Sequence, residues 1–191
     1  MNPMARNDER RSALADAGIR VLAEEGARGL THRAVDAAAG VPRGTASNYF
    51  PTRDDLIAAL VGRIAERLTP DPAVLAPLAD RTPDRALFAD YVRDIVRRLT
   101  ADPQVTLALF ELRLEASRRP SVAQTLGTWR QRSFEDDVAF NAQAGLPGGR
   151  TEIALFHYAL DGLMLDHLTV PIDTGLSVDA VVEELVERFL R

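Results

Sequence analysis

Polar side chains are concentrated in residues 40–56, whose sequence is GVPRGTASNYFPTRDDL. A helix that only supported a core would repeat apolar residues every three or four positions, and this segment does not. Its arginines carry a planar fork that pairs bidentately with phosphate oxygens or with the acceptor edge of guanine. Thr, Ser and Asn add short donors and acceptors between them. The segment therefore indicates recognition of a partner rich in hydrogen-bonding groups.

Catalytic or metal chemistry has little support in the rest of the chain. The sequence has no Cys, which excludes disulfides, thiol catalysis and Cys-based zinc sites. It also lacks a Gly-x-Ser-x-Gly elbow, a phosphate-binding loop, a His-Glu-x-x-His pair and a dinucleotide fingerprint. His157 and Asp161 share a helix face without visible further metal ligands, so we expect a hydrogen-bonded pair at a pocket or interface. We expect no catalytic residue, no metal and no cofactor.

Length and composition are those of an ordinary soluble globular protein. The 191 residues suffice for one large domain or two small ones, with 46% hydrophobic and 27% charged residues. The polar start, MNPMARNDERR, has no apolar region after it, and the most apolar run, residues 153–170, contains two His and two Asp. We therefore expect a cytoplasmic protein with no membrane partner.

Charge is unevenly distributed along the chain, whose net charge is −5. Residues 1–68 carry ten Arg and nine acidic residues, whereas residues 69–191 carry thirteen Arg and nineteen acidic residues. Lys is absent, which genomic codon bias explains better than a selection for Arg chemistry. The distribution permits a nucleic-acid partner for the N-terminal part without requiring one.

Short helices are predicted to carry the polar segment. An apolar stripe at helical spacing covers residues 8–25, and glycines follow it. Thr31 is a residue type favoured at an N-cap, and Pro42 is favoured at the first position of a helix. Asp54 and Asp55 open the helix that follows. The predicted helices are 8–25, 32–39, 42–50 and 54–68.

Two short helices joined by a tight turn that contains glycine are typical of a helix-turn-helix motif. Here the turn is Ala-Gly-Val-Pro, residues 39–42, in which Gly40 permits the sharp bend. The second helix of such a motif lies in the DNA major groove with its N-terminal residues at the base edges. A recognition helix must expose donors and acceptors, which accounts for the composition of residues 40–56.

Longer helices are predicted after a linker at residues 69–83 that holds four prolines. No segment alternates apolar and polar residues for long, so no strand is expected. The predicted fold is all-α, with an N-terminal three-helix helix-turn-helix DNA-binding domain and a larger C-terminal helical ligand-binding and dimerisation domain. The predicted domains are 1–68, which includes the connecting helix, and 69–191. The predicted C-terminal helices are 84–100, 103–118, 121–144, 150–169 and 178–190.

Residues 8–68 resemble the DNA-binding domain of the TetR family of transcriptional regulators. The resemblance rests on GIRVLAEEGARGLTHRAVDAAAGVPRGTASNYFPTRDDLIAAL, in which EEG, LT, AAAGV, RGTxxxYF and Arg-Asp-Asp-Leu follow one another in register. Where the family commonly has Leu-Tyr after Gly-Thr, this chain has Ala46 and Ser47, so a phosphate contact of that Tyr is replaced by Ser47 or lost. The resemblance implies a bacterial, homodimeric DNA-binding protein.

The residues expected to contact DNA lie in and around the second and third helices. Arg43, at the start of the recognition helix, can fork onto a guanine, while the hydroxyl and amide side chains after it can reach neighbouring base edges. The resemblance implies a base contact for Arg33 and phosphate contacts for Thr31, His32, Tyr49 and Arg53. The predicted DNA-binding residues are Thr31, His32, Arg33, Arg43, Gly44, Thr45, Ser47, Asn48, Tyr49 and Arg53.

The helices at 150–169 and 178–190 carry wide apolar faces. The first is apolar almost all round, which requires burial on both sides, and the second has a broad stripe at helical spacing. Packing both against a twofold copy would cover these faces in a four-helix interface, as the resemblance also implies; the alternative is a monomeric core. The predicted dimer-interface residues are Leu160, Met164, Leu168, Val178, Val182, Leu185 and Phe189.

A small-molecule pocket is predicted between the linker and this interface. Aromatic side chains would form its walls and a few polar groups would orient the ligand, although aromatic residues at helical spacing are more often core. The predicted pocket residues are Tyr91, Phe110, Arg113, Trp129, Phe140, Gln143, Phe156, His157 and Asp161, with Tyr158 as a further wall candidate.

The predicted function is that of a sequence-specific, DNA-binding transcriptional regulator. The specific hypothesis is a homodimeric repressor, nucleoid-associated when bound, that a small-molecule effector releases from a near-palindromic double-stranded operator through the helix at 54–68. Two alternatives are an effector-independent dimeric DNA-binding regulator and an enzyme acting on a small molecule bound in the C-terminal domain. The sequence leaves open the effector, the operator, the regulated genes and the direction of regulation.

Overall fold

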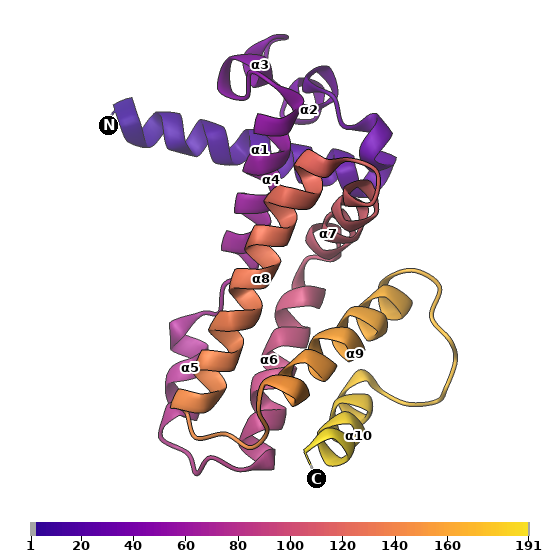
Figure 1. The fold of residues 1–191 in the computed structure, drawn as a ribbon. Coiled ribbons are helices and arrows are strands. Elements are labelled where there is room, and N and C mark those ends of the chain that lie inside the picture. The colour runs from indigo at the N-terminus through magenta and orange to yellow at the C-terminus, as the bar shows by residue number, and fades with distance from the viewer. Residues whose placement is uncertain (1–2, 191) are drawn as a thin grey trace. The chain divides into compact units, whose positions relative to one another are not determined.

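The computed structural model describes residues 3–190, and within that range the chain forms ten helices and no strand (Figure 1). The predicted all-α class is therefore confirmed. No helix in this range combines the length and the apolarity that crossing a bilayer requires. The helices are α1 (Pro3–Gly29), α2 (His32–Ala38), α3 (Thr45–Tyr49), α4 (Arg53–Leu68), α5 (Pro72–Ala79), α6 (Arg85–Ala101), α7 (Pro103–Ala116), α8 (Pro120–Gln143), α9 (Arg150–Leu168) and α10 (Val178–Phe189).

The helices are grouped into two compact units. The first unit consists of the residues up to Leu68 together with Pro103–Trp129, and the second of Thr69–Asp102 together with the residues from Arg130 onward. The chain leaves the first unit at Leu68, but α7 and the first part of α8 return to it. The bounds of the two compact units thus differ from those of the predicted domains, 1–68 and 69–191. The functions assigned to these domains stay a prediction.

One apolar core joins α1, α2, α4 and α7 in the first unit. The stripe on α1 contributes Leu14 and Leu22, which are fully buried, and α7 adds Leu112. α1 and α4 approach closely where Gly18 faces Leu60, because a Cβ on Gly18 would lie 2.8 Å from Leu60 Cδ1. The packing of α7 against α1 and α4 is what places α7 in this unit.

α1 extends beyond the predicted helix at both ends. It begins at Pro3 and continues to Gly29, but a kink interrupts it at Gly26, whose φ is 68°. Glycine adopts this left-handed conformation without the penalty that a Cβ imposes. Gly26 therefore bends the helix where the sequence predicted its end.

The recognition helix α3 is shorter than predicted. It spans Thr45–Tyr49 instead of residues 42–50, because Gly44 takes φ 89° and becomes the N-cap. Pro42 stands in the turn, where its carbonyl accepts hydrogen bonds from the backbone N–H of Thr45 at 3.2 Å and the Thr45 hydroxyl at 2.6 Å. The prediction that Pro42 opens the helix is therefore wrong.

The proline-rich stretch 69–83 is not a plain linker, because it contains α5. The Asp71 carboxylate caps this helix by accepting a hydrogen bond from Ala73 N at 2.9 Å, and Pro72 follows in the first turn. Proline is tolerated there since the first N–H groups of a helix have no intrahelical acceptor. The prediction of a linker over residues 69–83, made from its four prolines, therefore missed this helix.

α6, α9 and α10 build the core of the second unit. Phe156 of α9 lies at its centre, with its ring centroid 4.8 Å from that of Phe88 and 5.2 Å from that of Phe189. The side chains of Asp84 and Ser177 cap the N-termini of α6 and α10. One side of α9 is buried in this core and the other is open in the single chain. The predicted burial on both sides depends on a twofold copy and stays a prediction.

Candidate nucleic-acid interface

A tight turn connects α2 and α3 in the first unit (Figure 1). The Thr31 hydroxyl caps α2 by accepting a hydrogen bond from Ala34 N at 3.1 Å, as the sequence indicated. Gly40 then takes φ 63°, and the N–H of Val41 donates to the carbonyl of Asp36 at 3.0 Å. The predicted helix-turn-helix geometry is present, with α3 as its second helix.

The outward side of this motif carries the polar residues expected to read bases. Arg33, Arg43, Ser47 and Asn48 are exposed, and Thr45 is half-buried. The Ser47 hydroxyl donates to the Gly44 carbonyl at 3.0 Å, so its oxygen remains an acceptor on the surface. Beside it, Arg43 presents guanidinium donors and Asn48 presents an amide group. The surface of α3 thus offers the mixture of donors and acceptors that base edges require.

Two residues that the resemblance assigned to phosphate contacts are bound to the protein backbone. His32 Nε2 lies 2.6 Å from the carbonyl oxygen of Phe50, and Arg53 Nη2 donates to the carbonyl of Ala27 at 2.5 Å. Arg53 Nη1 donates to the carbonyl of Leu30, so the guanidinium ties the start of α4 to the end of α1. Contact of either side chain with DNA stays a prediction.

Tyr49 and Phe50 connect the recognition helix to the core of the first unit. Phe50 is fully buried, as expected from the sequence, and Tyr49 is half-buried against the same core. Arg11 of α1 donates to the Tyr49 carbonyl at 3.2 Å, and its guanidinium carbon lies 4.8 Å from the centre of the Phe50 ring. Contact of Tyr49 with phosphate also stays a prediction.

Asp36 is a functional candidate that the sequence interpretation missed. Its side chain is 2% exposed, and its two carboxylate oxygens accept hydrogen bonds at 2.7 Å from the backbone N–H groups of Gly44 and Ala46. An acidic residue inside the otherwise apolar stretch AVDAAA was the only available signal, because its partners lie across the turn.

The predicted pocket residues are divided between the two compact units. Phe110, Arg113 and Trp129 belong to the first unit, and the other six belong to the second. Within the second unit, Tyr91 and Phe140 meet edge to face at 5.0 Å, while Phe156 is buried in the core. The predicted pocket therefore stays a prediction.

His157 and Asp161 each have a partner on α8. His157 Nε2 lies 3.0 Å from a carboxylate oxygen of Asp137, and Arg130 donates to Asp161 at 3.1 Å. Within residues 3–190, no three His, Asp or Glu side chains are grouped as a metal ion would require. The two residues thus connect α9 to α8 within the second unit.

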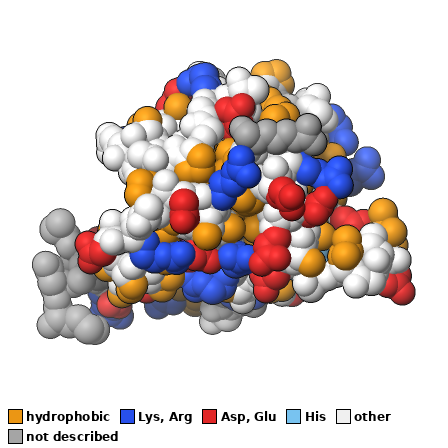
Figure 2. All heavy atoms as spheres, turned by 90° about the horizontal axis from the view of Figure 1, so that it is seen from below, with side chains coloured by type: hydrophobic (Ala, Val, Ile, Leu, Met, Phe, Trp, Pro, Cys, Tyr) orange, Lys and Arg blue, Asp and Glu red, His pale blue; other side chains and the backbone are white. Residues whose placement is uncertain are grey.

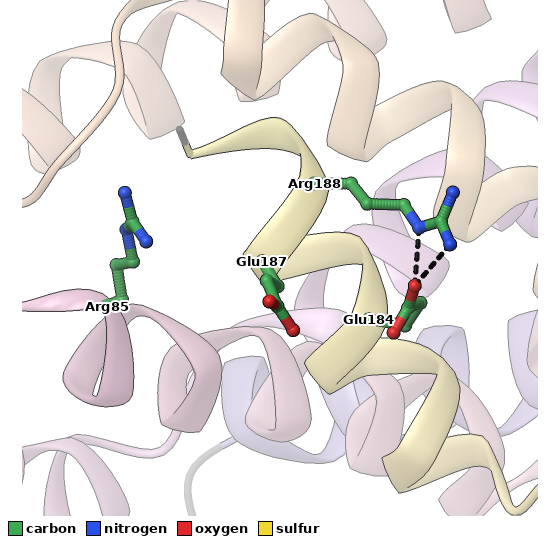
Figure 3. Close-up of a pocket in the computed structure, with 4 residues that line it drawn as sticks. All are labelled: Arg85, Glu184, Glu187 and Arg188. Atoms are coloured by element: carbon green, nitrogen blue, oxygen red, sulfur yellow. Dashed lines mark hydrogen bonds and ion pairs between the residues drawn. The ribbon is translucent and has the colours of Figure 1, made fainter.

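Two open hollows of about 630 and 510 Å³ lie on the second unit between α6 and α10. Arg85 projects from α6 and Glu187 from α10, and the carboxylate of Glu184 is paired with Arg188 at 2.5 Å (Figure 3). Basic and acidic side chains are also interleaved on the face drawn in Figure 2. These hollows therefore favour no ligand of a single charge sign, and none of the predicted pocket residues lines them.

Asp90 lies in the second hollow and joins a network of ion pairs. Burial acts to raise its pKa, but hydrogen bonds from Arg81 at 2.5 Å and Arg93 at 2.7 Å outweigh it and hold the pKa below its usual value. Arg93 also donates to Glu183 of α10 at 2.6 Å. The network thus links the segment before α6, α6 itself and α10.

The exposed apolar side of α9 differs from the predicted interface. Leu160, Met164 and Val182 are buried within their own chain, and the other four predicted interface residues are half-buried. The exposed stripe on α9 consists of Leu155, Tyr158, Gly162 and Leu165, which follow at helical spacing. The segment after α9 adds three exposed apolar side chains, Val170, Ile172 and Leu176.

A helix-turn-helix with a polar outward helix, followed by a larger helical region, defines a DNA-binding regulator of the helix-turn-helix class. Residues 14–60 match the model described as bacterial regulatory proteins, tetR family. Residues 83–191 match the model described as the tetracyclin repressor-like C-terminal domain. The chain belongs to the TetR family of transcriptional regulators, which confirms the expected resemblance.

Known relatives cover nearly the whole chain. The transcriptional regulator BetI of Rhizobium meliloti (strain 1021) is 28% identical over 186 residues, which is 95% of this chain and 90% of BetI. The multidrug binding protein EbrR, solved with imidazole, is 31% identical, covers 95% of both chains and has a TM-score of 0.65. A TetR-family protein from Streptomyces coelicolor A3 is 29% identical, covers 96% of this chain and 99% of its own, and has a TM-score of 0.71.

Proposed function

We propose that this regulator is a homodimeric repressor that binds a near-palindromic operator and is released from it by a small molecule. The observation that carries the DNA-reading part is the exposed polar surface of α3 within a helix-turn-helix. Two such helices related by a twofold axis read two half-sites about one helical turn apart. The proposed site of action is the bacterial cytoplasm, on chromosomal DNA.

Arg43, Ser47 and Asn48 are the proposed base-reading residues, because all three are exposed on or beside α3. Arg33 is exposed on α2 and supplies a further cation at the same surface. Thr31 and Gly44 contribute backbone geometry as the N-caps of α2 and α3. Base contacts then determine sequence preference, while phosphate contacts determine register and salt dependence.

Selection from random DNA duplexes by the purified protein at near-physiological salt tests the DNA-reading proposal. Sequencing of the bound pool is expected to show one enriched, twofold-symmetric site. Enrichment of an asymmetric half-site would contradict the dimeric reader. Absence of any enrichment by folded protein, with and without candidate effectors, would contradict sequence-specific DNA binding.

The proposed dimer uses the exposed stripe Leu155, Tyr158, Gly162 and Leu165 on α9. The same stripe of a second copy can cover an apolar stripe of this kind, since a twofold interface brings the same surface patch of both copies together. α10 packs on α9, and its half-buried residues are proposed to add to the interface. This surface replaces the more deeply buried residues that the sequence predicted.

The proposed effector is an aromatic cation bound within the second unit. EbrR structures at 29% and 27% identity contain ethidium and proflavin, which are planar aromatic compounds. In this chain, residues 69–102 and 130–191 carry seventeen acidic residues and ten Arg, so the region attracts cations. Aromatic walls such as Tyr91 and Phe140, which already meet at 5.0 Å, would stack on a planar ring.

Titration with ethidium and proflavin tests the effector proposal, with an anionic dye of similar size as the control. The cations are expected to bind the free protein more tightly than the operator complex and to weaken operator binding by about 5–150-fold. Equal affinity for free and DNA-bound protein would contradict effector control and favour the effector-independent dimer. Chemical turnover of a bound compound would instead support the enzyme alternative.

A further inference from the structure

The recognition helix α3 cannot hold its own conformation. It has only five residues, far fewer than the 12–15 or so that an isolated helix needs to be even marginally stable in water. Its N-cap is Gly44, which has no side chain to accept hydrogen bonds from the first N–H groups of the helix. The conformation of α3 must therefore be imposed by neighbouring elements.

Asp36 of α2 supplies the missing N-terminal cap. One carboxylate oxygen accepts the N–H of Gly44 and the other accepts the N–H of Ala46, both at 2.7 Å. The carboxylate is 2% exposed, so water does not compete for these hydrogen bonds. A buried, charge-assisted pair of this kind is stronger and more directional than a surface cap.

His32 holds the opposite end of α3. It precedes Asp36 by four residues, so the two side chains lie on the same face of α2, one turn apart. The carbonyl oxygen of Phe50, the C-cap residue of α3, lies 2.6 Å from His32 Nε2. Because a carbonyl can only accept, Nε2 carries the hydrogen and donates it.

We propose that Asp36 and His32 are positioning residues that hold the two ends of α3 and thereby determine how well the regulator distinguishes its operator from other DNA. The proposal rests on the proposed DNA-reading function of α3. Neither side chain needs to touch DNA for this role, because each acts on Arg43, Ser47 and Asn48 through the backbone of α3. Bidentate base contacts depend on orientation, whereas phosphate contacts tolerate small displacements. Loss of the hydrogen bonds from Asp36 or His32 therefore reduces the preference for the operator more than it reduces the affinity for DNA of any sequence.

Three substitutions separate this role from packing and from direct contact. His32→Gln keeps an N–H donor near the place of Nε2, whereas His32→Leu removes the donor at similar volume. Asp36→Asn keeps the shape of the side chain but turns one of its two acceptors into a donor that faces a backbone N–H. Ile64→Ala, at a buried position of α4, is a control that lowers stability without removing a hydrogen bond to α3.

The affinity of each variant is measured for the selected operator and for a scrambled duplex of equal length, over a series of salt concentrations. His32→Leu and Asp36→Asn are expected to lose at least about tenfold in operator affinity, while scrambled-duplex affinity and the salt slope stay near those of the wild type. His32→Gln and Ile64→Ala are expected to keep the operator-to-scrambled ratio. Amide exchange at Gly44 and Ala46, followed by NMR without DNA, is expected to accelerate in Asp36→Asn.

Unchanged operator-to-scrambled ratios in both His32→Leu and Asp36→Asn would overturn the proposal. A salt slope reduced by about one in His32→Leu would make His32 a phosphate contact instead. Unaltered amide exchange at Gly44 and Ala46 in Asp36→Asn would also refute the proposal that Asp36 stabilises the N-terminal end of α3. Failure of the wild type to prefer any duplex would refute the proposed DNA reading, and the exchange measurement would still decide whether Asp36 holds α3.

Discussion

Arg43 is the side chain whose chemistry is most specific to base reading. It is exposed immediately before the N-cap of α3, where residues of a recognition helix meet base edges. Arg53, by contrast, has both terminal nitrogens bound to backbone carbonyls at the end of α1 and beyond it. Two arginines that look equivalent in the sequence are therefore in different chemical situations.

Arg43→Ala is expected to weaken binding to the selected operator by about 1–3 kcal/mol and to relax the preference at one base position of each half-site. The reason is loss of a bidentate contact to guanine. A competition assay against operators changed at single positions measures both effects. Arg132→Ala, an exposed position of α8 in the second unit, is the control and is expected to bind as the wild type does. Equal loss at every position would argue for a phosphate contact instead.

Asp90 makes the stability of the second unit dependent on pH. Burial acts against ionisation, but the hydrogen bonds from Arg81 and Arg93 outweigh it, so its folded-state pKa is lowered. A lowered pKa means that the carboxylate contributes stability above its unfolded pKa of about 3.9 and that this contribution is lost as pH falls through the folded-state pKa. Asp90→Asn is therefore expected to be less stable than the wild type by up to about 1 kcal/mol at pH 7.

Urea unfolding at pH 7 and at about pH 3 checks this prediction. The difference between wild type and Asp90→Asn is expected to narrow at the lower pH, because the Asp90 carboxyl of the unfolded wild-type chain becomes protonated below its pKa of about 3.9. Asp136→Asn, exposed on α8, is the matched control and should show little difference at either pH. A gap that persists undiminished at low pH would show that packing, and not charge, accounts for the effect.

The turn between α2 and α3 requires a left-handed backbone conformation at Gly40. Gly40 has φ 63°, and a Cβ built on it would meet nothing within 4 Å. Gly62 in α4 likewise has open space around it but lies in a regular helix. The same chemical change at these two glycines should therefore have opposite effects.

Gly40→Ala is expected to destabilise the first unit by about 1–2 kcal/mol, because an L-residue is strained in the left-handed region. Gly62→Ala is expected to stabilise it by about 0.5–1 kcal/mol, because alanine loses less conformational entropy in a helix. Thermal and urea unfolding of the two variants give the comparison. Destabilisation by both would mean that space, not backbone conformation, limits these positions.

α8 belongs to both units, with residues 120–129 in the first and 130–143 in the second. α7 is part of the first unit, where Gln104 donates to Glu24 of α1 at 2.8 Å. Arg119, between α7 and α8, is paired with Asp54 of α4 at 3.3 Å. Any effector-dependent change in the second unit therefore has a continuous helix, α8, as a route to the DNA-binding unit, in addition to the α4 lever expected from the sequence.

Assembly of the whole molecule is expected to depend on the open side of α9. Gly162→Arg places a long cation in the exposed apolar stripe beside Tyr158, so it should prevent a second copy from approaching. Sedimentation is expected to give twice the chain mass of 20.9 kDa for the wild type and the single mass for the variant. Circular dichroism checks that the variant remains helical.

Leu114→Glu provides the control for this prediction, since Leu114 is 57% exposed on α7 and lies outside the α9 stripe. It should leave the mass unchanged. Retention of the double mass by Gly162→Arg, or a monomeric wild type, would contradict the proposed interface. A monomeric variant should also bind half-sites without the cooperativity that a dimer provides.

Local chemistry alone was enough to predict nine of the ten helices of residues 3–190, the Thr31 cap, the Gly40 turn and the family. Apolar spacing, capping residues and glycines act over a few positions, so the sequence displays them directly. Local chemistry was insufficient where a proline is compatible with more than one structure. Pro42 lies in the turn instead of opening α3, and the proline-rich residues 72–79 form α5 instead of a linker.

Only the tertiary structure decided which polar side chains of the first unit are exposed and which bond to other parts of the protein. His32, Asp36 and Arg53 bond to groups 8 to 26 residues away along the chain. The aromatic residues that the sequence grouped as one pocket are distributed between two units. The apolar α9 is covered on one side only by the core of its own chain. Such contacts depend on how distant segments pack, and periodicity along the chain carries no information about them.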